Sequence, residues 1–213
     1  MSPNISAPDR NASSVVLTGR LPTSSISLST RGILCSLPDP TTHPDPDVPT
    51  HRARVEGLLT EAADEHEALL AVLTPELQAS LPVDAQGITR AIDHLAAAAG
   101  LTEDERRALI RPHAVNPAVM HARVFGRAPL ARETVIGSFV DGARVRADAL
   151  VGLADAVGGA ALGAEIRALL ADHPPPVTAE GGDVVPVLRA TYAAQERAAV
   201  AIAAALDGPC HTR

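Results

Sequence analysis

The chain has 213 residues and a mass of 21.9 kDa, a length that fits one domain with or without a tail. All 18 basic residues are arginines, and 25 acidic residues give a formal net charge of −7. The only aromatic residues are Phe125, Phe139 and Tyr192, which weighs against base stacking on single-stranded nucleic acid and against an aromatic cage for cations. Lysine-free sequences rich in Ala, Gly and Pro are typical of GC-rich genomes, such as those of actinobacteria.

The cysteine positions and the lack of a long apolar run weigh against several further classes of protein. Cys35 and Cys210 lie near opposite ends of the chain and provide neither a disulfide framework nor the spacing of a zinc site. We therefore predict no metal and no cofactor. No run approaches the roughly twenty apolar residues that span a bilayer, and the N-terminus lacks the pattern of a secretory signal. We expect a cytoplasmic protein that does not enter a membrane.

The first fifty residues differ in composition from the rest. Residues 1–50 are rich in Ser, Thr, Pro, Asn and Asp, and such a segment cannot bury enough apolar surface to order itself. It is predicted to be a disordered leader. A sharper hypothesis places the natural start near Val48 and treats residues 1–47 as a gene-model extension, which mass spectrometry of the native protein would test. The domain itself is expected over 51–208, followed by a tail at 209–213.

The domain is predicted to be an all-α bundle of six to seven helices. Apolar residues recur at helical spacing over three long segments, 52–73, 130–157 and 184–206, which form the frame. Shorter helices are expected from an Asp84 cap to Gly100, from a Thr102–Glu105 capping box to Pro112, from Asn116 to Gly126, and over 162–170 after a break at Gly158-Gly159. No segment alternates like a strand.

His66 is the first candidate for chemistry. It occupies an inward position of the first long helix, where an imidazole could act as a general base or bind a metal with Glu61 or Glu65. The Glu-x-x-His pattern of di-iron bundles does not occur in the chain, so the metal hypothesis is poor. A buried, hydrogen-bonded structural histidine is favoured.

The last long helix carries polar side chains on its inner face. Thr191 is expected to bond the carbonyl group one turn back and to be structural. Gln195 needs partners, and His66 on a facing helix is the predicted one. If they meet, the contact is either structural, the favoured alternative, or the floor of a small ligand pocket to which Tyr192 contributes its phenol.

The charge distribution gives the third candidate. Between Arg106 and Arg146 there are eight arginines against two acidic residues, Glu133 and Asp141, in a segment with several Pro and Gly breaks. Irregular segments on a rigid frame often carry binding residues, and the guanidinium group suits carboxylate or phosphate. The predicted ligand-binding residues of this segment are Arg111, His113, Arg123 and Arg127, with His121 as a second catalytic candidate beside His66. Alternatively, the arginines neutralise the acidic helix 56–67 within the same bundle. This hypothesis and the anion-site hypothesis are equally favoured.

Three functional hypotheses follow. The first is a small accessory or binding protein that holds an anionic small molecule or an acidic protein partner. The second is a small cofactor-independent enzyme, for example in natural-product biosynthesis, that uses His66 or His121 as acid and base. The third and weakest is a DNA-binding regulator, against which the net charge and the absence of a turn signature weigh. Ala-rich faces and a long terminal helix are compatible with a symmetric homodimer.

Overall fold

A computed structural model of the chain describes residues 48–72, 85–110, 132–177 and 184–208. Every regular element in these ranges is an α-helix, which confirms the predicted all-α class. The five described helices are α1 (His51–Ala71), α3 (Gln86–Ala98), α4 (Glu103–Ile110), α6 (Arg132–Ala171) and α7 (Val184–Asp207). The leader, the tail and the helix expected at 116–126 lie outside the described residues, so the count of six to seven helices stays a prediction.

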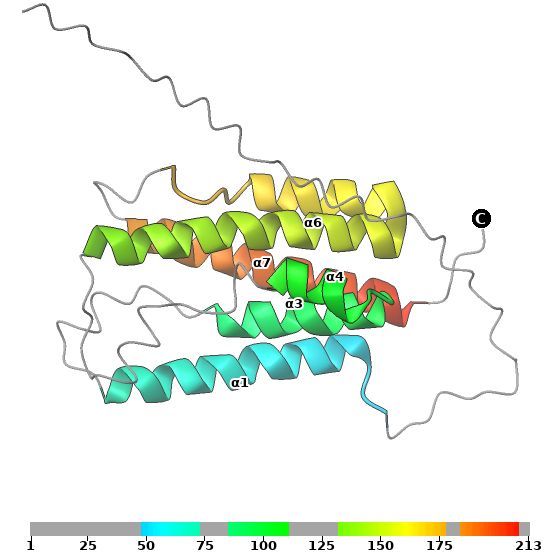
Figure 1. Cartoon of the computed structure of the whole chain (residues 1–213), viewed down its shortest axis with the longest axis horizontal. Coiled ribbons are helices and arrows are strands. Elements are labelled where there is room, and N and C mark those ends of the chain that lie inside the picture. Colours follow the sequence, from blue (N-terminus) through cyan, green and yellow to red (C-terminus); the bar gives the residue numbers. More distant parts are fainter. Residues whose placement is uncertain (1–47, 73–84, 111–131, 178–183, 209–213) are drawn as a thin grey trace, which may run out of the picture.

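Helix α7 is the centre of the bundle. It packs against α1, α3 and α6, and Figure 1 shows it lying between the long α6 and the α1–α3 pair. Its inner face consists largely of alanines with a few larger residues such as Leu188 and Ile202, all fully buried. Small side chains let the neighbouring helices approach closely, which compensates for a core that is nearly free of aromatic rings.

The first helix begins at a cap that the last helix provides. The Asp207 carboxylate, at the end of α7, accepts hydrogen bonds of 2.8 Å from the backbone N–H groups of both His51 and Arg52. The Thr50 hydroxyl accepts a third bond, of 3.1 Å, from the N–H of Ala53. These acceptors satisfy N–H groups that have no partner inside the helix. The start of α1 is thereby fixed to the end of α7.

The signals between α3 and α4 act as the sequence predicts. Gly100 has φ +77° and ends α3, with its N–H bonded to the carbonyl of Ala97 at 3.0 Å. Thr102 and Glu105 then form the predicted capping box, in which the Glu105 carboxylate accepts a 2.8 Å bond from the Thr102 N–H. At the other end of α3, Ala85 occupies the N-cap position and no described side chain caps the helix, while Asp84, the predicted cap, lies outside the described residues.

Helix α6 bends at the predicted break. Gly159 has φ 65° and ψ −165°, a conformation outside the helical region that glycine adopts without a steric cost. The two arms of α6 fold back beside each other (Figure 1), and an ion pair of 3.3 Å between Arg167 and Asp155 links them. Within α6, Ile136–Ala171 is apolar and long enough to span a membrane by length and composition, which is weak evidence because core helices pass the same test.

Helices α1 and α3 lie side by side and meet at a glycine. A Cβ atom added at Gly87 would lie 2.8 Å from the Cβ of Ala62 and 3.3 Å from the carbonyl oxygen of Leu58. The absence of a side chain at Gly87 therefore permits the close contact between the two helices. Two grooves flank this contact, and together they hold the charged and titratable side chains considered next.

Candidate functional site

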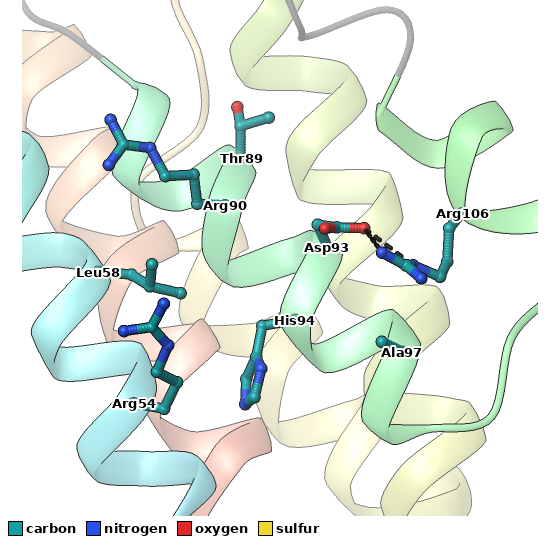
Figure 2. Close-up of a pocket in the computed structure, with 8 residues that line it drawn as sticks. All are labelled: Arg54, Leu58, Thr89, Arg90, Asp93, His94, Ala97 and Arg106. Carbon is teal, nitrogen blue, oxygen red and sulfur yellow. Dashed lines mark hydrogen bonds and ion pairs between the residues drawn. The ribbon is translucent and has the colours of Figure 1, made fainter. Parts of the chain in front are cut away.

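The first groove lies where α1, α3 and α4 meet, and we call it the arginine groove. It has a volume of about 440 Å³. Figure 2 shows its eight lining residues: Arg54, Leu58, Thr89, Arg90, Asp93, His94, Ala97 and Arg106. Three arginines, one from each helix, thus surround a single concavity together with a hydroxyl group and an imidazole. Asp93 is the one acidic residue among the eight.

Ion pairs within the bundle hold the arginines in place. The Nε and Nη2 groups of Arg106 donate bonds of 2.9 and 2.7 Å to one oxygen of Asp93, as the dashed lines in Figure 2 mark. Arg90 pairs with Glu65 on α1. The contacts to Glu61 are much looser, 3.8 Å from Arg54 and 3.9 Å from Arg90. Pairs of that length between exposed groups contribute little free energy, so the guanidinium groups of Arg54 and Arg90 can still bind another anion.

His94 connects the groove to the start of α1. Its Nε2 atom lies 3.1 Å from Nδ1 of His51, within hydrogen-bonding distance, and the ring centroids are 5.2 Å apart. Burial lowers the pKa of His94, and the neighbouring His51 and Arg54 lower this pKa further, against smaller opposing effects of Asp93 and Asp207. At neutral pH His94 is therefore an uncharged group that can become a fourth cation of the groove when the pH falls.

The groove differs from the basic segment predicted as the binding region. Arg111, His113, His121, Arg123 and Arg127 lie outside the described residues. Among the described residues, the arginines that pair with the acidic α1 are Arg52, Arg54 and Arg90, and none of these three belongs to the 106–146 segment. Within that segment, Arg106, Arg107 and Arg144 pair instead with acids of α3, α4 and α6. Arg106 is the one described residue that belongs both to the predicted segment and to the groove.

Arg146 and Gln195 form a polar contact inside the core. Arg146 is 3 % exposed, so its place in the basic segment does not make it a surface residue. Its Nε donates a 3.1 Å bond to the amide oxygen of Gln195, whose nitrogen donates a 2.7 Å bond to the carbonyl of Ala143. The predicted partner of Gln195 was His66, and this is corrected: the amide binds α6. The prediction placed Gln195 on the face of α7 that meets α1, whereas its side chain lies on the face that meets α6.

Tyr192 belongs to the same buried contact. The guanidinium carbon of Arg146 lies 4.8 Å from the centre of the Tyr192 ring, and the phenol donates a 3.3 Å bond to the carbonyl of Phe139. Thr191, one residue earlier, bonds the carbonyl of Val187 at 3.0 Å, the structural role expected from the sequence. The phenol of Tyr192 is thus directed to α6, while its ring forms part of a second groove.

This second groove lies between α1, α3 and α7, and we call it the α7 groove. It has a volume of about 200 Å³. The residues that line it are Leu59, Ala62, Ala63, His66, Gly87, Ile88, Arg189, Tyr192, Ala193 and Glu196. His66, which is half-buried, and Tyr192 both line this groove, whereas Gln195, which the pocket hypothesis placed against His66, does not. Arg189 and Glu196 were not singled out from the sequence.

Comparisons with protein-family models, with curated proteins and with solved structures give no match to this chain. The two grooves therefore have to be interpreted from their own residues. Within the described ranges, no three His, Cys, Asp or Glu side chains gather as metal ligands.

Proposed function

We propose that this protein is a small helical binding protein that holds an anionic small molecule in the arginine groove. The observation that carries the proposal is that Arg54, Arg90 and Arg106, from three different helices, line one groove. Arginine donates planar, paired N–H groups that match carboxylate and phosphate oxygens. The proposed ligand class is the one expected from the sequence, but the binding residues are different.

The groove geometry supports a small molecule over an acidic protein partner. A volume of about 440 Å³ falls in the range of small-molecule pockets. Leu58 and Ala97 offer apolar contact for a carbon skeleton, and the Thr89 hydroxyl adds a neutral hydrogen-bonding group. A ligand carboxylate or phosphate would replace the loose contacts of Arg54 and Arg90 with Glu61 by direct charge-assisted hydrogen bonds.

The test is a titration of the full chain with citrate, inorganic phosphate and adenosine monophosphate, followed by calorimetry and thermal shift. We expect saturable binding of at least one of them, and a loss of about tenfold in affinity for Arg54→Ala or Arg90→Ala, because a hydrogen bond to a charged group contributes about 1.5–3 kcal/mol. Arg107→Ala is the matched control, since Arg107 neighbours Arg106 on α4 but does not line the groove. Binding that is absent, or equally sensitive to Arg107→Ala, contradicts the proposal.

The other functional hypotheses have less support than the anion-binding proposal. An enzyme that uses His66 as acid and base is supported by the place of His66 in the lining of the α7 groove, where its side chain is half-buried. Turnover lost specifically in His66→Gln would favour that alternative. Cytoplasmic location and a homodimer remain proposals, which fractionation and light scattering would test.

A further inference from the structure

The α7 groove carries an inference that is independent of the anion site. We propose that it binds a small aliphatic zwitterion, a molecule with one ammonium and one carboxylate group on a short apolar skeleton, such as an aliphatic amino acid. Arg189 would bind the carboxylate and Glu196 the ammonium group. The skeleton would lie on the aliphatic surface between them.

The first argument is the apolar floor. Leu59, Ala62 and Ala63 of α1, Ile88 of α3 and Ala193 of α7 line the groove with aliphatic side chains, and Tyr192 lines it as well. Gly87 adds no side chain and brings α3 close to α1 at this place. A volume of about 200 Å³ is small. The floor therefore suits a ligand with only a few carbon atoms.

The second argument is the pair of opposite charges at the rim. Arg189 and Glu196 are seven residues apart, which puts them on one face of α7 at a separation of about 10 Å along the axis. Among the described residues, neither side chain forms a hydrogen bond or ion pair, whereas Arg90 of the arginine groove pairs with Glu65. Both side chains face the same groove. A ligand that carries both charges can bridge them.

The third argument comes from the solvation of Glu196. Glu196 is an exposed residue of α7, but the neighbouring helices remove part of the water around its carboxylate, and this desolvation raises its pKa. A carboxylate that is partly desolvated and has no cationic partner gains from a ligand ammonium group, because the group replaces the lost water with a charge-assisted hydrogen bond. His66, also in the lining, can accept or donate a further bond to the ligand.

Charge complementarity also decides against simpler ligands. A monocarboxylate would satisfy Arg189 but would place a negative charge near Glu196. A primary amine would satisfy Glu196 but would meet Arg189 as a like charge. Only a molecule with both groups makes two favourable contacts, so specificity arises from repulsion as well as attraction.

The test is calorimetry on the full chain with four probes: leucine, 5-aminovalerate, 4-methylpentanoate and 3-methylbutylamine. We expect one of the two zwitterions to bind roughly tenfold or more tightly than the acid and the amine, because each of these lacks one charged contact. Leucine and 5-aminovalerate differ in the distance between their charges, so their ranking shows whether the site takes an α- or an ω-amino acid. Equal binding of the amine, the acid and the zwitterions overturns the proposal, as does a lack of binding by both zwitterions.

Variants locate the site. Glu196→Gln and Arg189→Gln are each expected to weaken zwitterion binding about tenfold, and Ala193→Leu to block it by filling the groove. Arg197→Gln and Ala190→Leu are the matched controls, because these residues are exposed on α7 and do not line the groove. If Ala193→Leu fails to fold, the two charge variants decide the matter. Zwitterion binding that survives both Glu196→Gln and Arg189→Gln contradicts the site.

Discussion

The two grooves share residues of α1 and α3 but differ in whether their charged side chains already have partners. In the arginine groove, cations from three helices are held by acids of the bundle, so an incoming anion competes with partners already present. In the α7 groove, Arg189 and Glu196 lie on one helix and find no partner among the described residues. The difference indicates two kinds of site, one built by convergence of like charges and the other by separation of opposite charges.

The largest expected effect comes from breaking the support of the α7 groove. Gln195→Leu removes the acceptor of Arg146 and the donor to Ala143 inside the core. We expect a loss of about 3 kcal/mol in the free energy of unfolding, because a buried charged group loses a hydrogen bond. Zwitterion binding should weaken with it, since Arg146 also contacts the Tyr192 ring. Urea denaturation measures the stability change.

A double variant provides the control for that prediction. Gln195→Leu combined with Arg146→Met replaces both polar partners with apolar side chains and should cost clearly less than the sum of the two single changes. An additive result would show that the two side chains do not act as a pair. Anion binding at the arginine groove is expected to survive in the double variant if it folds.

The next largest effect is expected from a substitution that disturbs both grooves at once. Gly87→Val inserts a branched side chain where even a Cβ atom would lie 2.8 Å from that of Ala62. We expect a loss of about 2 kcal/mol in stability from overpacking, and weaker binding at both sites because α1 and α3 must separate. Gly57→Ala is the control: a Cβ atom there meets nothing within 4 Å, so the variant should be neutral or up to about 1 kcal/mol more stable. Thermal denaturation distinguishes the two.

A pH series sharpens the comparison. Protonation of His94 adds a cation to the arginine groove, so anion binding should tighten as the pH falls below the ordinary histidine pKa of about 6.5. Protonation of Glu196 removes the charge that binds an ammonium group, so zwitterion binding should weaken as the pH falls through its raised pKa. Opposite slopes in calorimetry at pH 7.5 and 5.0 are expected. His94→Gln should flatten the first slope and leave the second unchanged.

The same histidine links pH to stability. Because the pKa of His94 is lowered in the folded chain, the folded state binds fewer protons than the unfolded state. Stability is therefore expected to decline as the pH falls from the unfolded-state pKa toward the folded-state value, and His94→Gln should reduce that decline. Urea midpoints at pH 7.5 and 5.5 measure it. A decline of the same size in the variant would assign the effect to other groups.

The smallest expected effect is a gain in stability. Without ligand, Glu196→Gln removes a partly desolvated carboxylate, and we expect the variant to be neutral or up to about 0.5 kcal/mol more stable at pH 7. The direction follows from the raised pKa, which means that the charged form opposes folding. A stabilising change that weakens binding is typical of functional positions. A clearly destabilised variant would instead point to a structural role for Glu196.

The helices could be read from the sequence because their signals are local. The first long helix was expected over 52–73 and runs from His51 to Ala71, and the last was expected over 184–206 and runs from Val184 to Asp207. The break at Gly158-Gly159 and the Thr102–Glu105 capping box depend on residues a few positions apart. Such features are fixed by neighbouring residues in the chain, so a single sequence contains them.

The grooves could not be read in the same way because they join distant helices. Arg54 and Arg90 stand in stretches with nearby acids, so a count of charge along the chain hides them, and it pointed to the 106–146 segment instead. Similarly, the inward position of Gln195 was recognised, but whether it faces α1 or α6 depends on the rotation of α7 in the bundle. The spacing of Arg189, Tyr192 and Glu196 on one helical face was the one local signal of the α7 groove.

The cap that Asp207 provides to α1 has a mechanical consequence. The ends of the described helical domain meet at one corner of the bundle (Figure 1), held by two hydrogen bonds between groups 155 and 156 residues apart. A force that pulls residues 50 and 208 apart is therefore applied first to this corner, and it peels the first helix from the last one contact at a time. The long packed faces of α6 and α7 would carry load only afterwards, so the domain should yield at low force despite its closely packed core.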